Sequence, residues 1–98
     1  GPEAIEKISH VNADLCFLGT NALDIKHGHT DNDWDVVQVK KAMVNSASKV
    51  VCMTISEKLG TYQPIRVCGI ERIDYLVTEL DPEDEQLQPF VKAGINVL

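Results

Sequence analysis

Two short apolar runs, each followed at once by a loop of small and polar residues, constrain the fold of this chain most strongly. Residues 14–18 (DLCFL) precede residues 19–22 (GTNA), and residues 50–54 (VVCMT) precede residues 56–60 (SEKLG). The intervening segment has helical spacing, so the unit predicts neighbouring parallel strands joined by a right-handed crossover. Because ligands of open parallel sheets bind beyond the carboxyl ends of the strands, we expect both loops to share one functional rim.

The segment between the two runs predicts a helix over residues 34–48, with Asn32 or Asp33 as its amino-terminal cap. In such a helix the apolar residues Val36, Val39, Met43 and Ala47 would lie along one face. Lys40 and Lys41 are therefore predicted to lie on a solvated face. The preceding stretch, residues 19–35, is rich in Gly, Asn and Asp, which predicts a long loop.

The remaining segments complete an α/β pattern. They predict a short amphipathic helix (4–11), an extended or irregular stretch (61–67), a helical turn (69–73), a third strand (74–79), a turn (82–86), a short helix (89–93) ended by Gly94, and a fourth strand (95–98). We expect a mostly parallel sheet of about four strands with helices packed on it. A parallel sheet needs cover on both of its faces. About three helices are too few for that, so we expect these 98 residues to form one incomplete domain that lacks an amino-terminal part.

Composition narrows the function classes. The formal net charge of −6 argues against a broad surface for nucleic acid, which needs clustered Lys and Arg. No apolar run approaches the roughly 20 residues of a membrane span, and residues 1–10 lack a signal-peptide core. Cys16, Cys52 and Cys68 have no Cys-x-x-Cys spacing. We therefore predict buried thiols in a reducing cytoplasm and neither a metal nor a cofactor.

Four stretches together resemble a known family. They are ADLCFLGTNALDIKHGHT (13–30), VKKAMVNSASKVVCMTISEKLG (39–60), IDYLVTE (73–79) and GINVL (94–98). In order and spacing they resemble the carboxyl-terminal half of the effector domain of DeoR-family bacterial transcription regulators. The resemblance runs over nearly the whole chain and includes Gly1, Pro2 and Ala4, which favours a native start over a cloning remnant. Its most specific pieces are VKKAM (39–43), Ser56-x-Lys58-x-Gly60 and Gly19-x-Asn21-Ala22.

The resemblance implies a sensor of a phosphorylated sugar or similar metabolite that changes the operator affinity of the intact regulator. It implies a doubly wound fold similar to the sugar-phosphate isomerase and coenzyme A transferase group. DNA would be bound only by an amino-terminal winged helix-turn-helix, which these residues do not include. Two departures remove carboxylates near the expected site: Ile55 stands where the family usually has Asp, and residues 36–38 (VVQ) lack the usual Glu. Both leave the identity of the ligand open.

The candidate ligand-binding residues lie in the two loops and at the end of the long polar stretch. They are Gly19, Thr20, Asn21, Thr30, Lys58 and Gly60. A lysine after a strand can pair with a phosphate as a point charge, and the nearby glycine allows close backbone approach. An asparagine can bind a sugar hydroxyl or simply hold a turn. No residue is assigned a catalytic role.

Several other polar residues could have functional roles, but most have simpler structural explanations. His27, His29 and Asp31 suggest a metal site, and a His-x-His pair can bind zinc. A third and a fourth ligand for that pair are not obvious, so solvent-facing histidines are favoured. Tyr62 and Arg66 could border the pocket. Asp24 and Asp35 could act as acid and base, although nothing singles either out. The acidic run 81–85 is interpreted as a helix start.

Two alternative functions remain at this level. One is a sugar-phosphate isomerase or transferase, which requires a carboxylate placed for proton abstraction. The other is an assembly module, because parallel-sheet edges favour pairing with another copy. The sensor interpretation also includes a homo-oligomer and no membrane contact.

Overall fold

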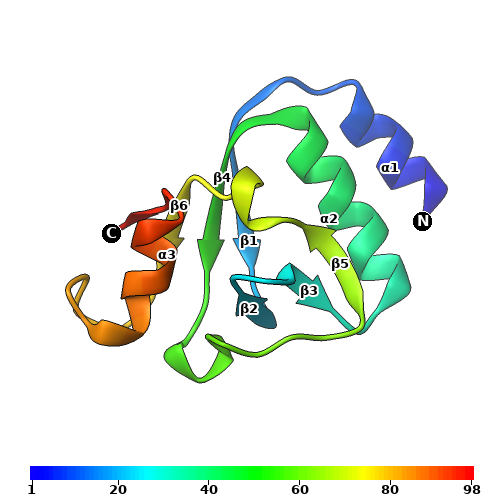
Figure 1. The fold of residues 1–98 in the computed structure, drawn as a ribbon. Coiled ribbons are helices and arrows are strands. Elements are labelled where there is room, and N and C mark those ends of the chain that lie inside the picture. Colours follow the sequence, from blue (N-terminus) through cyan, green and yellow to red (C-terminus); the bar gives the residue numbers. More distant parts are fainter.

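Four parallel strands form the main sheet of the computed structural model, which describes residues 1–98. In spatial order they are β1 (Ala13–Gly19), β4 (Ala47–Met53), β6 (Tyr75–Val77) and β7 (Asn96–Val97). Each neighbouring pair of strands is parallel (Figure 1). Leu18 of β1 lies opposite Cys52 of β4, which lies opposite Leu76 of β6. The predicted parallel sheet is confirmed.

The helices lie toward opposite ends of this sheet. α1 (Pro2–Ser9) and α2 (Trp34–Ser46) pack together near the amino terminus, and α3 (Gln88–Lys92) lies near the carboxyl terminus (Figure 1). Asp33 caps α2, since its carboxylate accepts the backbone N–H groups of Asp35 and Val36. At the other end of α2, the Arg72 guanidinium donates to the Val44 carbonyl at 2.7 Å.

The prediction of a long loop over residues 19–35 is wrong. It contains β2 (Ala22–Asp24) and β3 (Gly28–Asp31), which form an antiparallel hairpin. β5 (Ile65–Cys68), from the stretch predicted to be extended or irregular, adds to β3 and completes a three-stranded second sheet. The residues of β3 are largely polar but fully buried, and their polarity is what made the segment resemble a loop.

The buried face of α2 also differs from the prediction. Val37 and Val44 are buried, whereas Val36 is exposed. Lys40 is three residues after Val37 and four before Val44, so it lies on the same inward stripe. Its ammonium donates to the Gly19 carbonyl, and the predicted solvated position of Lys40 is therefore wrong. Lys41 is exposed, as expected.

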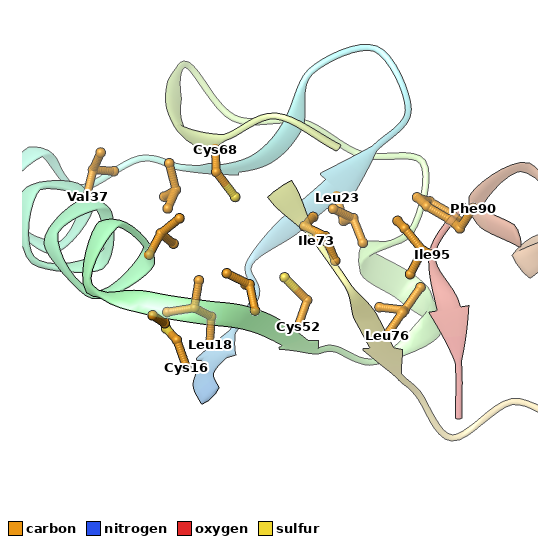
Figure 2. Packing of buried hydrophobic residues seen from close by; sticks show 14 of the residues in the cluster. Cys16, Leu18, Leu23, Val37, Cys52, Cys68, Ile73, Leu76, Phe90 and Ile95 are labelled. Carbon is orange, nitrogen blue, oxygen red and sulfur yellow. The ribbon is translucent and has the colours of Figure 1, made fainter. Parts of the chain in front are cut away.

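The core lies between the two sheets and is closed by α2 and α3. Figure 2 shows Leu18, Cys52 and Leu76 pointing from the main sheet toward the side where the smaller sheet lies. The hydrophobic core consists of Cys16, Leu18, Leu23, Val37, Val44, Ala47, Val50, Cys52, Val67, Cys68, Ile73, Leu76, Leu87, Phe90 and Ile95. The opposite face of β1 is bare: Leu15 is 46% and Phe17 55% exposed. At β1, therefore, only one face of the main sheet is covered.

Among the other short elements, the turns at 70–72 and 85–87 correspond to predicted turns, whereas residues 56–58 were predicted as a loop. Single 3₁₀ turns form at Ser56–Lys58, Ile70–Arg72 and Glu85–Leu87. Asp84, in the acidic run, accepts the Gln86 N–H and so starts the last of these turns. No helix is both long and apolar enough to cross a membrane.

Two glycines with the same backbone angle provide a matched test of the second sheet. Gly28 and Gly60 both have φ of 77°, a value that disfavours a side chain. A Cβ on Gly28 would collide with the Cys68 carbonyl of β5, while one on Gly60 would meet nothing within 4 Å. We expect Gly28→Ala to lower the free energy of unfolding by about 2 kcal/mol more than Gly60→Ala in urea titrations. Equal losses would show that β3 and β5 are not packed this closely.

Candidate functional site

The loops after β1 and β4 lie side by side at the carboxyl ends of their strands. The Thr20 N–H donates to the Met53 carbonyl at 3.0 Å, and the Thr54 hydroxyl donates to the Thr20 carbonyl at 3.0 Å. The loop after β6 also reaches this rim, because the Glu79 carboxylate accepts the Ser56 N–H at 2.8 Å. The rim expected from the two apolar runs is therefore formed.

A partly buried polar network holds the first loop in place. The Lys40 ammonium donates to the Gly19 carbonyl at 2.8 Å and to Asp31 Oδ2 at 3.2 Å. Asn21 Nδ2 donates to the same carboxylate oxygen at 3.1 Å. Backbone and side-chain hydrogen bonds, with the Lys40 charge, outweigh burial and hold the pKa of Asp31 below its usual range. The Gly19–Asn21 loop is thus tied to α2 and β3.

The second loop presents a cation that no acidic group of the chain neutralises. The Lys58 side chain is exposed, and its ammonium forms neither a hydrogen bond nor an ion pair. Its backbone is fixed, because the Lys58 N–H donates to the Ile55 carbonyl and the Thr61 hydroxyl donates to the Lys58 carbonyl. The Gly60 N–H donates to the Leu23 carbonyl at 2.8 Å, which attaches this loop to β2. A free ammonium on a fixed backbone is suited to an anionic ligand.

The six candidate residues fall into two groups. Gly19, Asn21, Lys58 and Gly60 are exposed along the rim. Thr20 and Thr30 are buried, and their hydroxyls are used inside the chain: Thr20 Oγ1 lies 3.4 Å from the Leu18 carbonyl, and Thr30 Oγ1 accepts the Gln63 N–H at 2.8 Å. The structure therefore brings four of these residues to the surface and places the two threonines beneath it.

The histidines of the long polar stretch have separate surroundings. His27 Nδ1 lies 2.9 Å from Asp24 Oδ2, and its ring stacks on Tyr62 with centroids 4.0 Å apart. His29 is fully buried, with Nδ1 4.0 Å from Cys52 Sγ and Nε2 without a partner. No group of three or more His, Cys, Asp or Glu side chains is arranged to hold a metal ion. The expectation that His29 faces solvent is wrong, because its side chain is buried and faces Cys52 of the main sheet.

The cysteines are buried, free thiols, as predicted. Burial raises the pKa of Cys16 above its usual value, that of Cys52 to about 11 and that of Cys68 to about 12. Thiols with such pKa values stay protonated near neutral pH, so they are poor nucleophiles. They serve as small core side chains.

Lys40 and Asp31 are the polar residues of the site that the sequence analysis did not assign to it. A usable signal was present, because Lys40 follows Val37 by three residues and precedes Val44 by four. A stripe drawn through Val37 places Lys40 inward, whereas a stripe drawn through Val36 places it outward. Both positions are valine, so the spacing alone did not separate the two.

Comparison with known proteins identifies the family. The family model of the DeoR C terminal sensor domain matches residues 1–80. The HTH-type transcriptional regulator GlpR of Haloferax volcanii is 35% identical over all 98 residues, which span 38% of its length. The putative aga operon transcriptional repressor of Escherichia coli O157:H7 is 24% identical over the same 98 residues, 36% of its length.

A third relative has a similar name and a similar extent of match. The HTH-type transcriptional repressor GlcR of Bacillus subtilis is 26% identical over 98 residues, 38% of its length. The chain thus spans well under half the length of these relatives, all of which are named as regulators of transcription. With the matched model covering residues 1–80, the chain belongs to the DeoR family through its C-terminal sensor domain.

Proposed function

We propose that the chain is the metabolite-sensing part of a DeoR-type transcription regulator and binds a phosphorylated sugar or related small anion at the rim. The observation that carries this proposal is the free Lys58 ammonium on a fixed turn. The Gly60 N–H attaches this turn to Leu23 of β2, shortly after the Gly19–Asn21 loop. The position beyond the carboxyl ends of parallel strands is where ligands of such sheets bind.

Charge and hydrogen bonding support an anion of limited size. Lys58 supplies a point charge, and the exposed Gly19 and Asn21 supply backbone and amide groups on the neighbouring loop. Thr20 and Thr30 lie beneath the surface, where their hydroxyls contact the Leu18 carbonyl of β1 and the Gln63 N–H. The net charge of −6 fits one local anion site better than contact with a nucleic acid backbone.

Sensing requires that the ligand favour one of two arrangements of the regulator. In this proposal, closure of the rim around the metabolite shifts a homo-oligomer between such arrangements in the cytoplasm. A separate DNA-binding module then changes its affinity for the operator. Self-association is favoured by the bare face of β1, where Leu15 and Phe17 are exposed.

Removing the Lys58 ammonium tests the proposal. We expect Lys58→Ala to weaken binding of sugar phosphates about tenfold, because a charge-assisted contact contributes roughly 1.5–3 kcal/mol. The measurement is isothermal titration calorimetry, supported by the ligand-induced shift in melting temperature. Lys41→Ala, which removes another exposed lysine away from the rim, is the control and should bind as the parent does. Unchanged binding by Lys58→Ala would remove Lys58 from the site.

A further inference from the structure

A cavity of about 260 Å³ opens directly beside the proposed anion-binding loop. It lies between the β2–β3 hairpin, the loop after β4 and the start of α3. Its lining residues are Asp24, Ile25, Leu59, Gly60, Gln86, Pro89 and Phe90. Leu59 and Gly60 follow Lys58 immediately in sequence, so the cavity and the free ammonium belong to the same short segment.

The walls of the cavity are fixed by the fold. Leu59 forms a parallel bridge with Leu23, and the Gly60 N–H donates to the Leu23 carbonyl, which attaches one wall to β2. The opposite wall is formed by Phe90, a core residue of α3. Because both walls are anchored in the core, the cavity is preformed and does not depend on a rearrangement of the chain.

The polar groups of the lining favour a neutral, hydroxylated guest. Asp24 is oriented by His27, since its Oδ1 accepts the His27 N–H at 2.6 Å and its Oδ2 lies 2.9 Å from His27 Nδ1. The stack of His27 on Tyr62 limits movement of that histidine. A held carboxylate retains lone pairs that accept hydrogen bonds from hydroxyl groups, and its charge repels an anion.

The remaining lining residues match the other surfaces of such a guest. The Gln86 side chain is exposed at the cavity and forms no hydrogen bond within the chain, so its amide is free both to donate and to accept. Ile25, Leu59 and Pro89 offer apolar surface for C–H groups. The volume is below the roughly 300–1,000 Å³ of pockets for drug-sized ligands, which favours one sugar unit over a nucleotide.

We propose that this cavity binds the uncharged polyhydroxylated part of the effector while Lys58 holds its phosphate. The inference rests on the proposed function and adds to it the part of the site that selects among phosphorylated compounds. Asp24 and Gln86 act as the residues that distinguish a sugar phosphate from phosphate alone. Lys58 contributes equally to both, because it contacts only the shared phosphate.

The test compares inorganic phosphate with a panel of pentose and hexose phosphates by isothermal titration calorimetry on the intact regulator. We expect at least one sugar phosphate to bind more tightly than inorganic phosphate. Gln86→Ala should weaken that sugar phosphate about fivefold, the equivalent of one lost hydrogen bond, and leave inorganic phosphate unchanged. Asp24→Asn also removes a charge that repels anions, so it should reduce the preference for the sugar phosphate over inorganic phosphate. Lys58→Ala should weaken both ligands alike. Gln38→Ala, a glutamine of α2 outside the cavity, is the matched control.

The possible outcomes separate the two proposals. If inorganic phosphate binds through Lys58 but no sugar phosphate binds more tightly, or the cavity variants affect both ligands equally, the cavity has no selective role. If no phosphate compound binds the parent protein, the sensor proposal fails and the cavity proposal fails with it. Melting temperatures of each variant show whether a lost affinity reflects lost folding, and the exposed Gln86 is the position where folding is least affected.

Discussion

Replacing Lys40 by methionine is expected to lower the free energy of unfolding by about 3 kcal/mol, as found when one partner of a buried ion pair is removed. Lys40 is 16% exposed, and Asp31, its partner at 3.2 Å, is nearly fully buried. Methionine keeps the apolar stem but leaves the Asp31 carboxylate without its cation and the Gly19 carbonyl without its donor. Urea titration at neutral pH measures the loss.

Two further variants show whether the loss comes from the ion pair. Lys41→Met removes the neighbouring charge of the same helix, which is exposed and unpaired, and should change stability by less than about 0.5 kcal/mol. Lys40→Met combined with Asp31→Asn should recover part of the loss, because asparagine leaves no unpaired buried charge. A double variant no more stable than Lys40→Met alone would assign the loss to the Gly19 contact instead.

Stability is expected to fall by about 3 kcal/mol between pH 7 and pH 4 because of His29. Burial is the larger cause that lowers the pKa of His29 to about 4, the Lys40 charge acts in the same direction, and Asp31 opposes both. In the unfolded chain the histidine titrates near 6.5. Between these values only the unfolded state binds the proton, so unfolding becomes easier as the pH falls. Above about pH 7 the histidine is neutral in both states, so it no longer makes stability depend on pH.

Urea titrations at pH 4, 5, 6 and 7 measure this slope. His29→Leu removes the titrating group and should flatten the curve, without a penalty for the lost Nε2, which has no partner in the fold. His10→Asn, at an exposed histidine, should keep the parent slope. Asp31 contributes separately: since its pKa lies below the ordinary 3.8, its contribution is lost only at still lower pH. A His29→Leu variant with the parent slope would contradict this account.

The main sheet could be predicted because its strands are apolar runs bounded by turn residues. In β1 and β4 the local pattern and the tertiary environment agree, and the helix between them begins at a capping residue, Asp33. The hairpin of β2 and β3 could not be predicted from composition. Its second strand, with His29, Thr30 and Asp31, is buried by tertiary hydrogen bonds that no local pattern reveals.

Only part of the candidate site could be predicted from the sequence, for the same reason. Lys58 and Asn21 could be selected because each lies in the loop that follows a strand, and the direction of parallel strands places both loops at one edge. The network of Lys40 and Asp31 joins a helix to the second sheet, so it depended on the missed hairpin. The cavity beside Gly60 likewise requires knowing that the segment after β4 lies against β2.

The outer edge of β1 has a consequence for handling the protein. β1 pairs only with β4, so its outer row of backbone groups is open to pairing with another chain. Leu15 and Phe17 add exposed apolar side chains on the bare face of the same strand. At high concentration this open edge is therefore where we expect another copy of the chain to add a strand.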